Sequence, residues 1–153
     1  MQQQKINKAK EAQENSVDKT VEKSVKKLVR NKIAYAGSVS LGGAPNIKAM
    51  LVAKREGDTV FYFASNLGSR RVAQWRKDSR ACIYFNGGIV YEGVMLEGTM
   101  QILDDEASRR DIWTPSMGFV YKGGVDDPDY CVLKFTANRG RYYKMFKSYD
   151  FEL

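Results

Sequence analysis

Short runs of β-forming residues, separated by tight turns, make up most of the chain from Ile33 onward. One expected turn is Asn86-Gly87-Gly88, and another, Arg55-Glu56-Gly57-Asp58, joins a predicted hairpin of residues 46–54 and 59–65. Most runs lie too close together for the helical crossovers of a doubly wound parallel sheet. We therefore predict antiparallel strands in a closed or nearly closed barrel, because closure removes exposed sheet edges. The expected strands are residues 33–39, 46–54, 59–65, 80–85, 89–103, 130–136 and 139–145.

Three helices are expected beside these strands. The first covers about residues 16–30, where Val17, Val21 and Val25 recur at helical spacing. Two short helices are predicted to begin at Ser69 and at Asp104-Asp105, since serine and aspartate cap helix N-termini. The predicted fold class is thus mainly β with inserted α, with six or seven strands. The polar residues 1–15 are expected to be flexible, and residues 16–153 are expected to form a single domain.

The chain contains no histidine and only two cysteines. This composition excludes Ser-His-Asp and Cys-His catalytic sets, histidine-ligated zinc or haem, and a four-thiolate zinc site. We therefore predict no metal site, and no catalytic side chain can be identified. If the protein is an enzyme, a bound organic cofactor is expected to carry the difficult chemistry.

The formal net charge is +7, and much of the basic excess lies in the first 32 residues. A solvated helix face accounts for such a charge run, although a basic surface also suits nucleic acid, phosphorylated ligands or an anionic membrane. No apolar run approaches the roughly 20 residues that a membrane-spanning helix needs, so no membrane partner is predicted. Cys82 and Cys131 are expected to be free thiols, and the cytoplasm is the predicted compartment.

The segment from Phe61 to Trp75 carries the strongest chemical signal. A strand ends at Ser65, a glycine turn follows and a helix begins at Ser69, so two hydroxyls and the free N–H groups of a helical turn should converge. Arg70 and Arg71 lie at the same positive helix end, which is unfavourable unless an anion is present. The sequence therefore predicts a phosphate site here, with a capped helix and solvated arginines as the alternative.

The strand before this segment adds a second feature. Lys48, Met50 and Val52 share one of its faces, so Lys48 is within plausible reach of the same phosphate. The small Ala49 would let a flat ring approach the backbone, whose N–H and C=O groups can bond the polar edge of the ring. A surface lysine at a strand end is the alternative.

These two stretches, residues 45–50 and 63–70, resemble the flavin-binding core of the pyridoxamine 5′-phosphate oxidase-like proteins, and most of all the general-stress-protein type. The stretch Tyr121-Lys122-Gly123-Gly124-Val125-Asp126-Asp127-Pro128-Asp129-Tyr130 resembles the glycine–aspartate–proline motif of the same family. The resemblance covers roughly residues 32–147. It implies a split barrel, a homodimer, and flavin mononucleotide (FMN) bound in clefts at the dimer interface.

The resemblance also assigns roles by position. Matches to the phosphate end of the site are Lys48, Ser65, Ser69 and Arg70, with Arg71 beside them. Ala49, Met50 and Leu51 match the strand whose backbone lies along the isoalloxazine ring, and Gln74 matches a position that often contacts the flavin. Trp113 resembles an aromatic residue that covers the ring from the other subunit, although core or interface packing is the alternative. Arg70→Ala is expected to weaken FMN binding strongly.

The chain departs from true pyridoxamine phosphate oxidases, whose C-terminal arginine and histidine bind the substrate, because it has no histidine. The function predicted first is a flavoprotein oxidoreductase that passes electrons from a reduced nicotinamide to a small acceptor. The alternatives are a flavin-binding sensor without turnover and a deazaflavin-binding reductase of the same fold. A nucleic-acid-binding barrel, with Tyr35 and Phe61 among its stacking aromatics, is a remoter one.

Overall fold

The computed structural model describes residues 2–88 and 91–153. Within these residues, eight strands form one antiparallel sheet in the order β2-β1-β5-β6-β7-β4-β3, and β8 pairs with β7. The strands are β1 (Ile33–Val39), β2 (Pro45–Leu51), β3 (Lys54–Glu56), β4 (Val60–Asn66), β5 (Arg80–Asn86), β6 (Glu92–Leu103), β7 (Tyr130–Lys144) and β8 (Lys147–Glu152). The helices are α1 (Gln2–Leu28), α2 (Arg70–Lys77), α3 (Glu106–Ile112), and the 3-10 helices η1 (Pro115–Phe119) and η2 (Gly124–Asp126).

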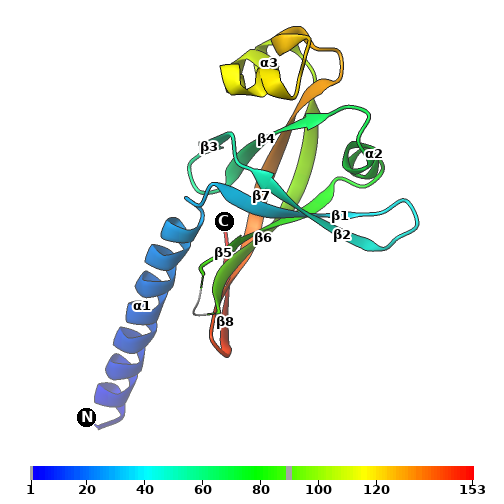
Figure 1. Ribbon diagram of the computed structural model, residues 1–153. Coiled ribbons are helices and arrows are strands. Elements are labelled where there is room, and N and C mark those ends of the chain that lie inside the picture. The colour runs from blue at the N-terminus through cyan, green and yellow to red at the C-terminus, as the bar shows by residue number, and fades with distance from the viewer. Residues whose placement is uncertain (1, 89–90) are drawn as a thin grey trace.

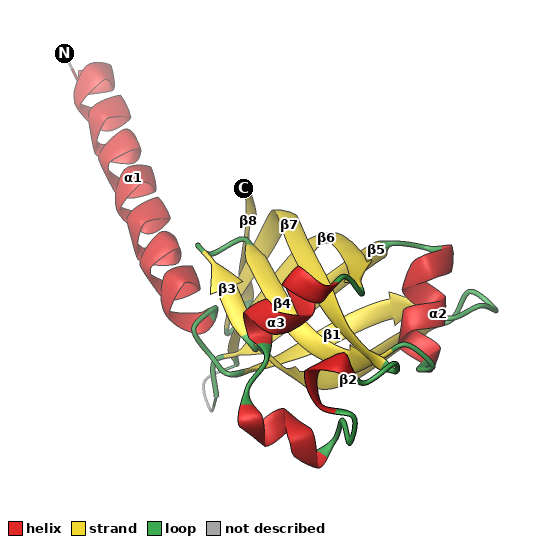
Figure 2. Cartoon of the chain, turned by 90° about the horizontal axis from the view of Figure 1, so that it is seen from above, coloured by secondary structure: helices red, strands yellow, loops and turns green. Residues whose placement is uncertain are grey.

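The sheet curls into a half-barrel around an apolar core (Figure 2). Phe61 packs against Phe85 and Phe135, with ring centroids 5.3 and 6.4 Å apart, and all three rings are fully buried. The two longest strands, β6 and β7, pair with each other along the barrel, and a β-bulge between Glu97 and Gly98 bends them. Only glycine fits at position 98, because a Cβ there would lie 1.9 Å from the carbonyl oxygen of Thr136. The predicted mainly β class is confirmed, with one strand more than expected.

Helix α1 begins at Gln2, so the start predicted near Ser16 is wrong. Its last turns pack on the barrel through the buried residues Val25 and Leu28. The rest of the helix projects away from the barrel (Figure 1). The flexibility of residues 1–15 and the single domain of residues 16–153 stay predictions.

The hairpin predicted from residues 46–54 and 59–65 is only partly formed. β2 pairs with β1, and the short β3 takes its place beside β4. The chain passes from the β1 side to β4 between two neighbouring residues. Val52 N donates to Lys32 O, just before β1, at 2.8 Å, and Ala53 N donates to Tyr62 O, in β4, at 2.8 Å. The alternation of buried and exposed residues continues through this crossing, so the pattern does not reveal it.

The two strands predicted at residues 130–136 and 139–145 form one continuous strand, β7. In place of the break expected between them there is a β-bulge, whose extra residue, Asn138, lies between the partners of Glu97 and Gly98. The real turn is Met145-Phe146, and the strand after it, β8, was missed because neither residue favours a tight turn.

Candidate functional site

The loop between β4 and α2 brings several polar groups to one place. Ser69 caps α2: its backbone is extended, and its Oγ accepts a long 3.4 Å hydrogen bond from Val72 N. Ser69 N in turn donates to Asn66 O at 3.0 Å. The first turn of α2 contains no acidic residue, and the N–H groups of Arg70 and Arg71 have no acceptor within the helix. The positive end of α2 is therefore open to an external anion.

Two serines and one arginine converge at this helix end. Arg71 Nε donates to Ser65 Oγ at 3.2 Å, and Ser65 Oγ lies 3.5 Å from Ser69 Oγ. Ser65 is only 1% exposed and Arg71 is half-buried, whereas Arg70 is exposed. The structure thus brings Ser65, Ser69 and Arg71 into one cluster, with Arg70 at its edge.

Asp129, just before β7, stabilises the loop between β4 and α2 through hydrogen bonds. Its Oδ1 accepts from Gly68 N at 2.9 Å, its Oδ2 accepts from Asn66 Nδ2 at 2.7 Å, and its carbonyl accepts from Leu67 N at 2.7 Å. The backbone bond from Gly68 and the side-chain bond from Asn66 lower the pKa of this carboxyl. No role was predicted for Asp129 itself, which belongs to the glycine–aspartate–proline stretch of residues 121–130.

Gln74 is held by a neighbouring strand. Its Oε1 accepts a 2.6 Å hydrogen bond from Ser38 Oγ on β1, and both side chains are buried. Ser38 pairs with Asn46 and Ala36 pairs with Lys48, so the exposed Lys48 lies on the sheet face that α2 covers. Met50 is buried on this same face, next along β2.

Ala49 and Leu51 lie on the opposite face of β2 and are exposed. β2 is the last strand on its side of the sheet. Alternate backbone N–H and C=O groups along its outer edge therefore have no partner strand and can bond the polar edge of a ring.

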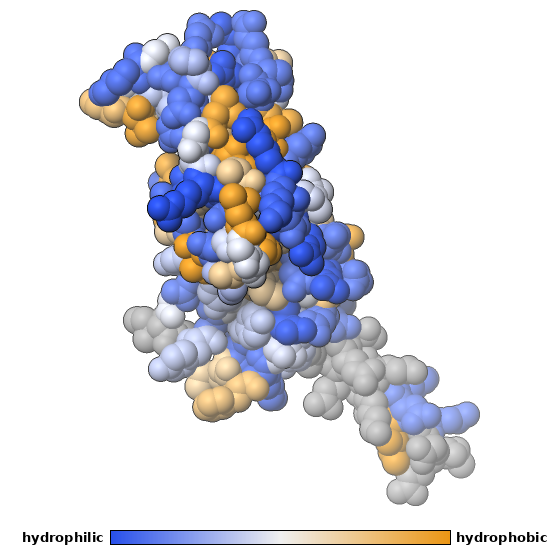
Figure 3. Space-filling view, turned by 90° about the vertical axis from the view of Figure 1, so that its right-hand side faces the viewer, coloured by the Kyte–Doolittle hydropathy of each residue, from blue (hydrophilic) through white to orange (hydrophobic). Residues whose placement is uncertain are grey.

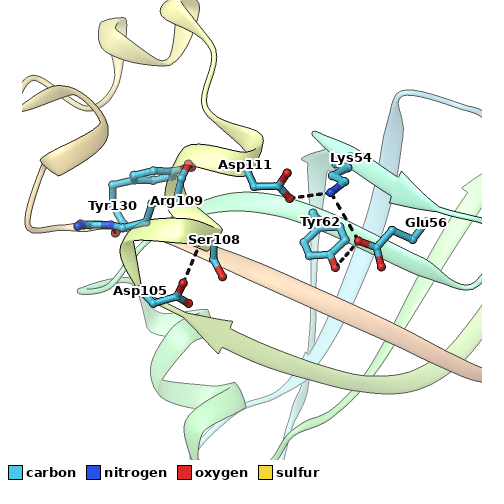
Figure 4. A network of polar contacts seen from close by, with 8 residues as sticks. All are labelled: Lys54, Glu56, Tyr62, Asp105, Ser108, Arg109, Asp111 and Tyr130. Carbon is cyan, nitrogen blue, oxygen red and sulfur yellow. Dashed lines mark hydrogen bonds and ion pairs between the residues drawn. The ribbon is translucent and has the colours of Figure 1, made fainter.

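Trp113 lies in an aromatic group beside α3, and Tyr130 of this group pairs with Asn66 at the end of β4. Its ring centroid is 5.4 Å from that of Tyr130 and 6.3 Å from that of Tyr121. Burial raises the pKa of Tyr121 and of Tyr130 to about 12. Arg109 donates to the carbonyl oxygens of Tyr130 and Asp127, which fixes α3 over this group. Figure 4 shows Arg109 beside the ring of Tyr130. The predicted role of Trp113 toward a partner subunit stays a prediction.

The donor set at the start of α2 fits a phosphate group. Hydroxyls, a guanidinium and free N–H groups are the donors that proteins use for phosphate. Lys48 lies on β2, which pairs with β1 and not with β4, the strand that carries Ser65. Among residues 2–88 and 91–153, no group of three or more His, Cys, Asp or Glu side chains could hold a metal ion. Cys82 and Cys131 are free thiols, as predicted.

Among the described residues, each helix falls short of the combination of length and hydropathy that a membrane crossing requires.

Comparison with known proteins gives a consistent result. The family model described as pyridoxamine 5′-phosphate oxidase like matches residues 19–149. A solved structure from Clostridium acetobutylicum, of a protein related to general stress protein 26, is 37% identical with a TM-score of 0.78, and the match covers 88% of this chain and 95% of that one. No curated protein sequence matches the chain.

More distant structures share the fold. General stress protein 26 from Bacillus anthracis is 16% identical with a TM-score of 0.68, over 86% of this chain and 97% of that one. A heme binding protein from Mycobacterium smegmatis is 14% identical with a TM-score of 0.66, over 86% of this chain and 57% of that one. The family match over most of the chain and the 37% identity lead to one conclusion: this chain belongs to the pyridoxamine 5′-phosphate oxidase-like family.

Proposed function

We propose that the chain binds FMN, with the phosphate group at the start of α2. The observation that carries the proposal is the convergence of Ser65, Ser69 and Arg71 at a helix end that has no acidic residue of its own. Arg70 and Lys48 are proposed to add positive charge at its margin. Asp129 holds the loop in place before any ligand arrives, so little ordering is needed on binding.

The flavin ring is proposed to lie along β2. Ala49, Met50 and Leu51 supply the backbone edge, and Gln74 lies on the adjacent helix with its side-chain oxygen bonded to Ser38. When bound, FMN supplies hydride and electron transfer, which no side chain of this protein can supply. The residues of the chain bind and orient it. The proposed reaction passes electrons from a reduced nicotinamide to a small acceptor in the cytoplasm.

The functional form is proposed to be a homodimer. Ile33 pairs with Leu51, and Ile47 lies opposite Gly37, so the side chains of Ile33, Leu51 and Ile47 share the outer face of the β1–β2 pair. Ile47 is 71% exposed and Leu51 is 60% exposed. A continuous apolar face of this kind is typical of a protein interface. A partner on this face would cover the ring site and could bring its own Trp113 to the flavin.

The first experiment is the visible absorption spectrum of the purified protein, with any released cofactor identified by chromatography. About one FMN per subunit supports the proposal. A colourless protein that does not bind added FMN refutes it, and a bound deazaflavin or haem would replace it. Reduction of the bound flavin by NADH or NADPH, followed by turnover with an acceptor, separates an oxidoreductase from a flavin-binding sensor.

The phosphate assignment needs its own test. Arg71→Ala should weaken FMN binding about 10- to 100-fold, because a charge-assisted hydrogen bond to the phosphate is lost. The same variant should bind riboflavin, which has no phosphate, as tightly as the parent does. Arg76→Ala, at the other end of α2, removes the same charge and should change neither affinity. Equal losses for FMN and riboflavin in Arg71→Ala would contradict the assignment. Arg70→Ala tests the more exposed arginine in the same titration.

A further inference from the structure

The turn between β7 and β8 meets the residue just before β6 at one end of the barrel, away from the proposed flavin site (Figure 1). Met145 N, in the turn between β7 and β8, donates to Tyr91 O, just before β6, at 3.0 Å. The side chains here are strongly exposed: Phe146 is 100% exposed, Tyr91 81% and Met145 52%. Lys144 and Lys147, which pair across the hairpin, are exposed on either side of the turn. We call these five residues the lysine-flanked tip.

The sequence of this turn is unfavourable for the turn itself. A two-residue hairpin loop favours glycine or asparagine, because at least one residue must take a positive φ. Here the first turn residue is Met145, with φ of 53°, and its neighbour Tyr91 has φ of 45°. Among the described residues, these are the non-glycine positions with positive φ. A strained backbone that presents apolar side chains to solvent indicates that the side chains are kept for a contact.

The chemistry of the tip suits an anionic lipid surface. An aromatic ring and a thioether can enter the boundary between headgroups and acyl chains, while the two flanking ammonium groups attract anionic headgroups. The carboxylate of Glu92, which pairs with Lys144 in the β6–β7 ladder, is bonded to the hydroxyl of Tyr142. Figure 3 shows apolar surface at the lower end of the molecule, where this hairpin ends.

Helix α1, with seven lysines and four acidic residues, supplies a second element of net positive charge at the same end. It projects past the barrel toward the level of the tip (Figure 1), and its exposed lysines include Lys8, Lys19, Lys23 and Lys27. Stable membrane attachment generally requires two weak signals, such as an apolar anchor and a polybasic segment. The tip and the helix together provide both.

We propose that the lysine-flanked tip docks the protein reversibly on an anionic lipid bilayer. The expectation that the chain has no membrane partner was based on the lack of a long apolar run, which a spanning helix needs and a surface contact does not. Docking is weak and depends on salt, because it combines a small apolar insertion with electrostatic attraction. It does not require bound flavin, so it can succeed or fail independently of the proposed function.

The test is co-sedimentation of the full chain with vesicles of phosphatidylcholine containing about one-third phosphatidylserine. The protein should pellet with these vesicles, remain in solution with pure phosphatidylcholine, and be released when ionic strength rises to about 0.5 M. The double variant Met145→Gly, Phe146→Ser should lose about tenfold or more in partitioning. It should also unfold at the same temperature or higher, because glycine followed by serine favours a two-residue hairpin turn.

The matched control is Phe119→Ser, which removes another strongly exposed phenylalanine, in η1 beside α3 at the opposite end of the molecule (Figure 1). Its vesicle binding should equal that of the parent. Three outcomes would overturn the proposal: no pelleting of the parent protein, equal pelleting of the double variant, or a change of the double variant from dimer to monomer in light scattering. The last result would assign the tip to a contact between copies of the chain.

Discussion

Helices α2 and α3 are both short, follow a barrel strand and begin at a capping side chain, yet their first turns differ in charge. α3 begins at Asp105, whose carboxylate accepts from Ser108 N at 2.9 Å, and Glu106 follows it. α2 begins at Ser69, with a 3.4 Å cap bond and arginines in place of acidic residues. The positive N-terminal end of α3 is therefore balanced by two acidic residues, whereas that of α2 is balanced by none.

The basic residues of the two helices differ in the same way. Arg109 of α3 bonds to backbone carbonyls and Arg110 bonds to Glu106 at 2.8 Å, while Lys54 fastens Asp111 to the barrel at 2.7 Å (Figure 4). In α2, Arg71 bonds to the hydroxyl of Ser65. The polar groups of α3 are thus paired within the fold, whereas the first turn of α2 has no acidic residue of its own. This difference supports our proposal that an anion binds at α2.

The largest effect on stability is expected at Arg109. Arg109→Ala should destabilise the fold by about 2 kcal/mol, because the carbonyls of Tyr130 and Asp127 lose their donor. In thermal unfolding the midpoint should fall by about 4–8 °C. Arg71→Ala should leave the ligand-free midpoint nearly unchanged, as should Arg110→Ala, whose ion pair with Glu106 is exposed. Equal destabilisation by Arg71→Ala and Arg109→Ala would remove the distinction between the two helices.

Exchanging the capping residues should shift the unfolding temperature of the ligand-free protein by a smaller amount, upward for α2 and downward for α3. Ser69→Asp gives α2 the acidic cap that α3 has, so the ligand-free protein should unfold at a slightly higher temperature. The same carboxylate would repel a phosphate, so FMN affinity should fall. Asp105→Ser in α3 should lower the midpoint slightly and leave FMN affinity unchanged. Thermal unfolding and flavin titration of both variants check this; a Ser69→Asp protein that keeps its FMN affinity would contradict the phosphate site.

Local sequence signals predicted much of this fold. The residues of β1 and the caps Ser69 and Asp105 agree with the structure, because strand alternation and capping depend on a few neighbouring residues. The pairing of β2 was wrong, because alternation does not reveal which strand is the partner. The break expected between residues 136 and 139 is a bulge at Asn138 within one strand, because alternation does not show that a strand continues past an extra residue.

In the candidate site too, contacts within one short segment were predictable and contacts between distant segments were not. Ser65, Ser69 and Arg71 are close in sequence, so their convergence could be predicted from one strand, one turn and one helix. Asp129 could not, because its bonds to Asn66 and Gly68 join segments more than 60 residues apart. Only the pairing of β4 with β7 brings them together. Contacts that are set by sheet pairing lie beyond what a single sequence pattern reveals.

The smallest predicted effect is the pH dependence of the α3 cap. The hydrogen bonds from Ser108, that of its backbone N–H first, lower the pKa of Asp105 below its unfolded value of about 3.9. A lowered pKa means that the unfolded chain binds this proton more readily than the folded chain does. The stabilisation is therefore fully present above about pH 4 and is lost as the pH falls through the folded pKa.

Asp105→Asn keeps a capping oxygen but cannot ionise, so the parent should be the more stable protein near pH 6, and the difference should shrink toward pH 3. Urea unfolding of both proteins at the two pH values measures this difference, and other carboxyls, including those of Asp78 and Asp150, cancel in the comparison. The control is Asp104→Asn, which removes a charge one residue earlier without touching the cap bond. A stability difference between Asp105→Asn and the parent that stayed constant with pH would show that the charge of Asp105 does not stabilise the start of α3. The caps Asp105 and Ser69 would then differ only in the length of their hydrogen bonds.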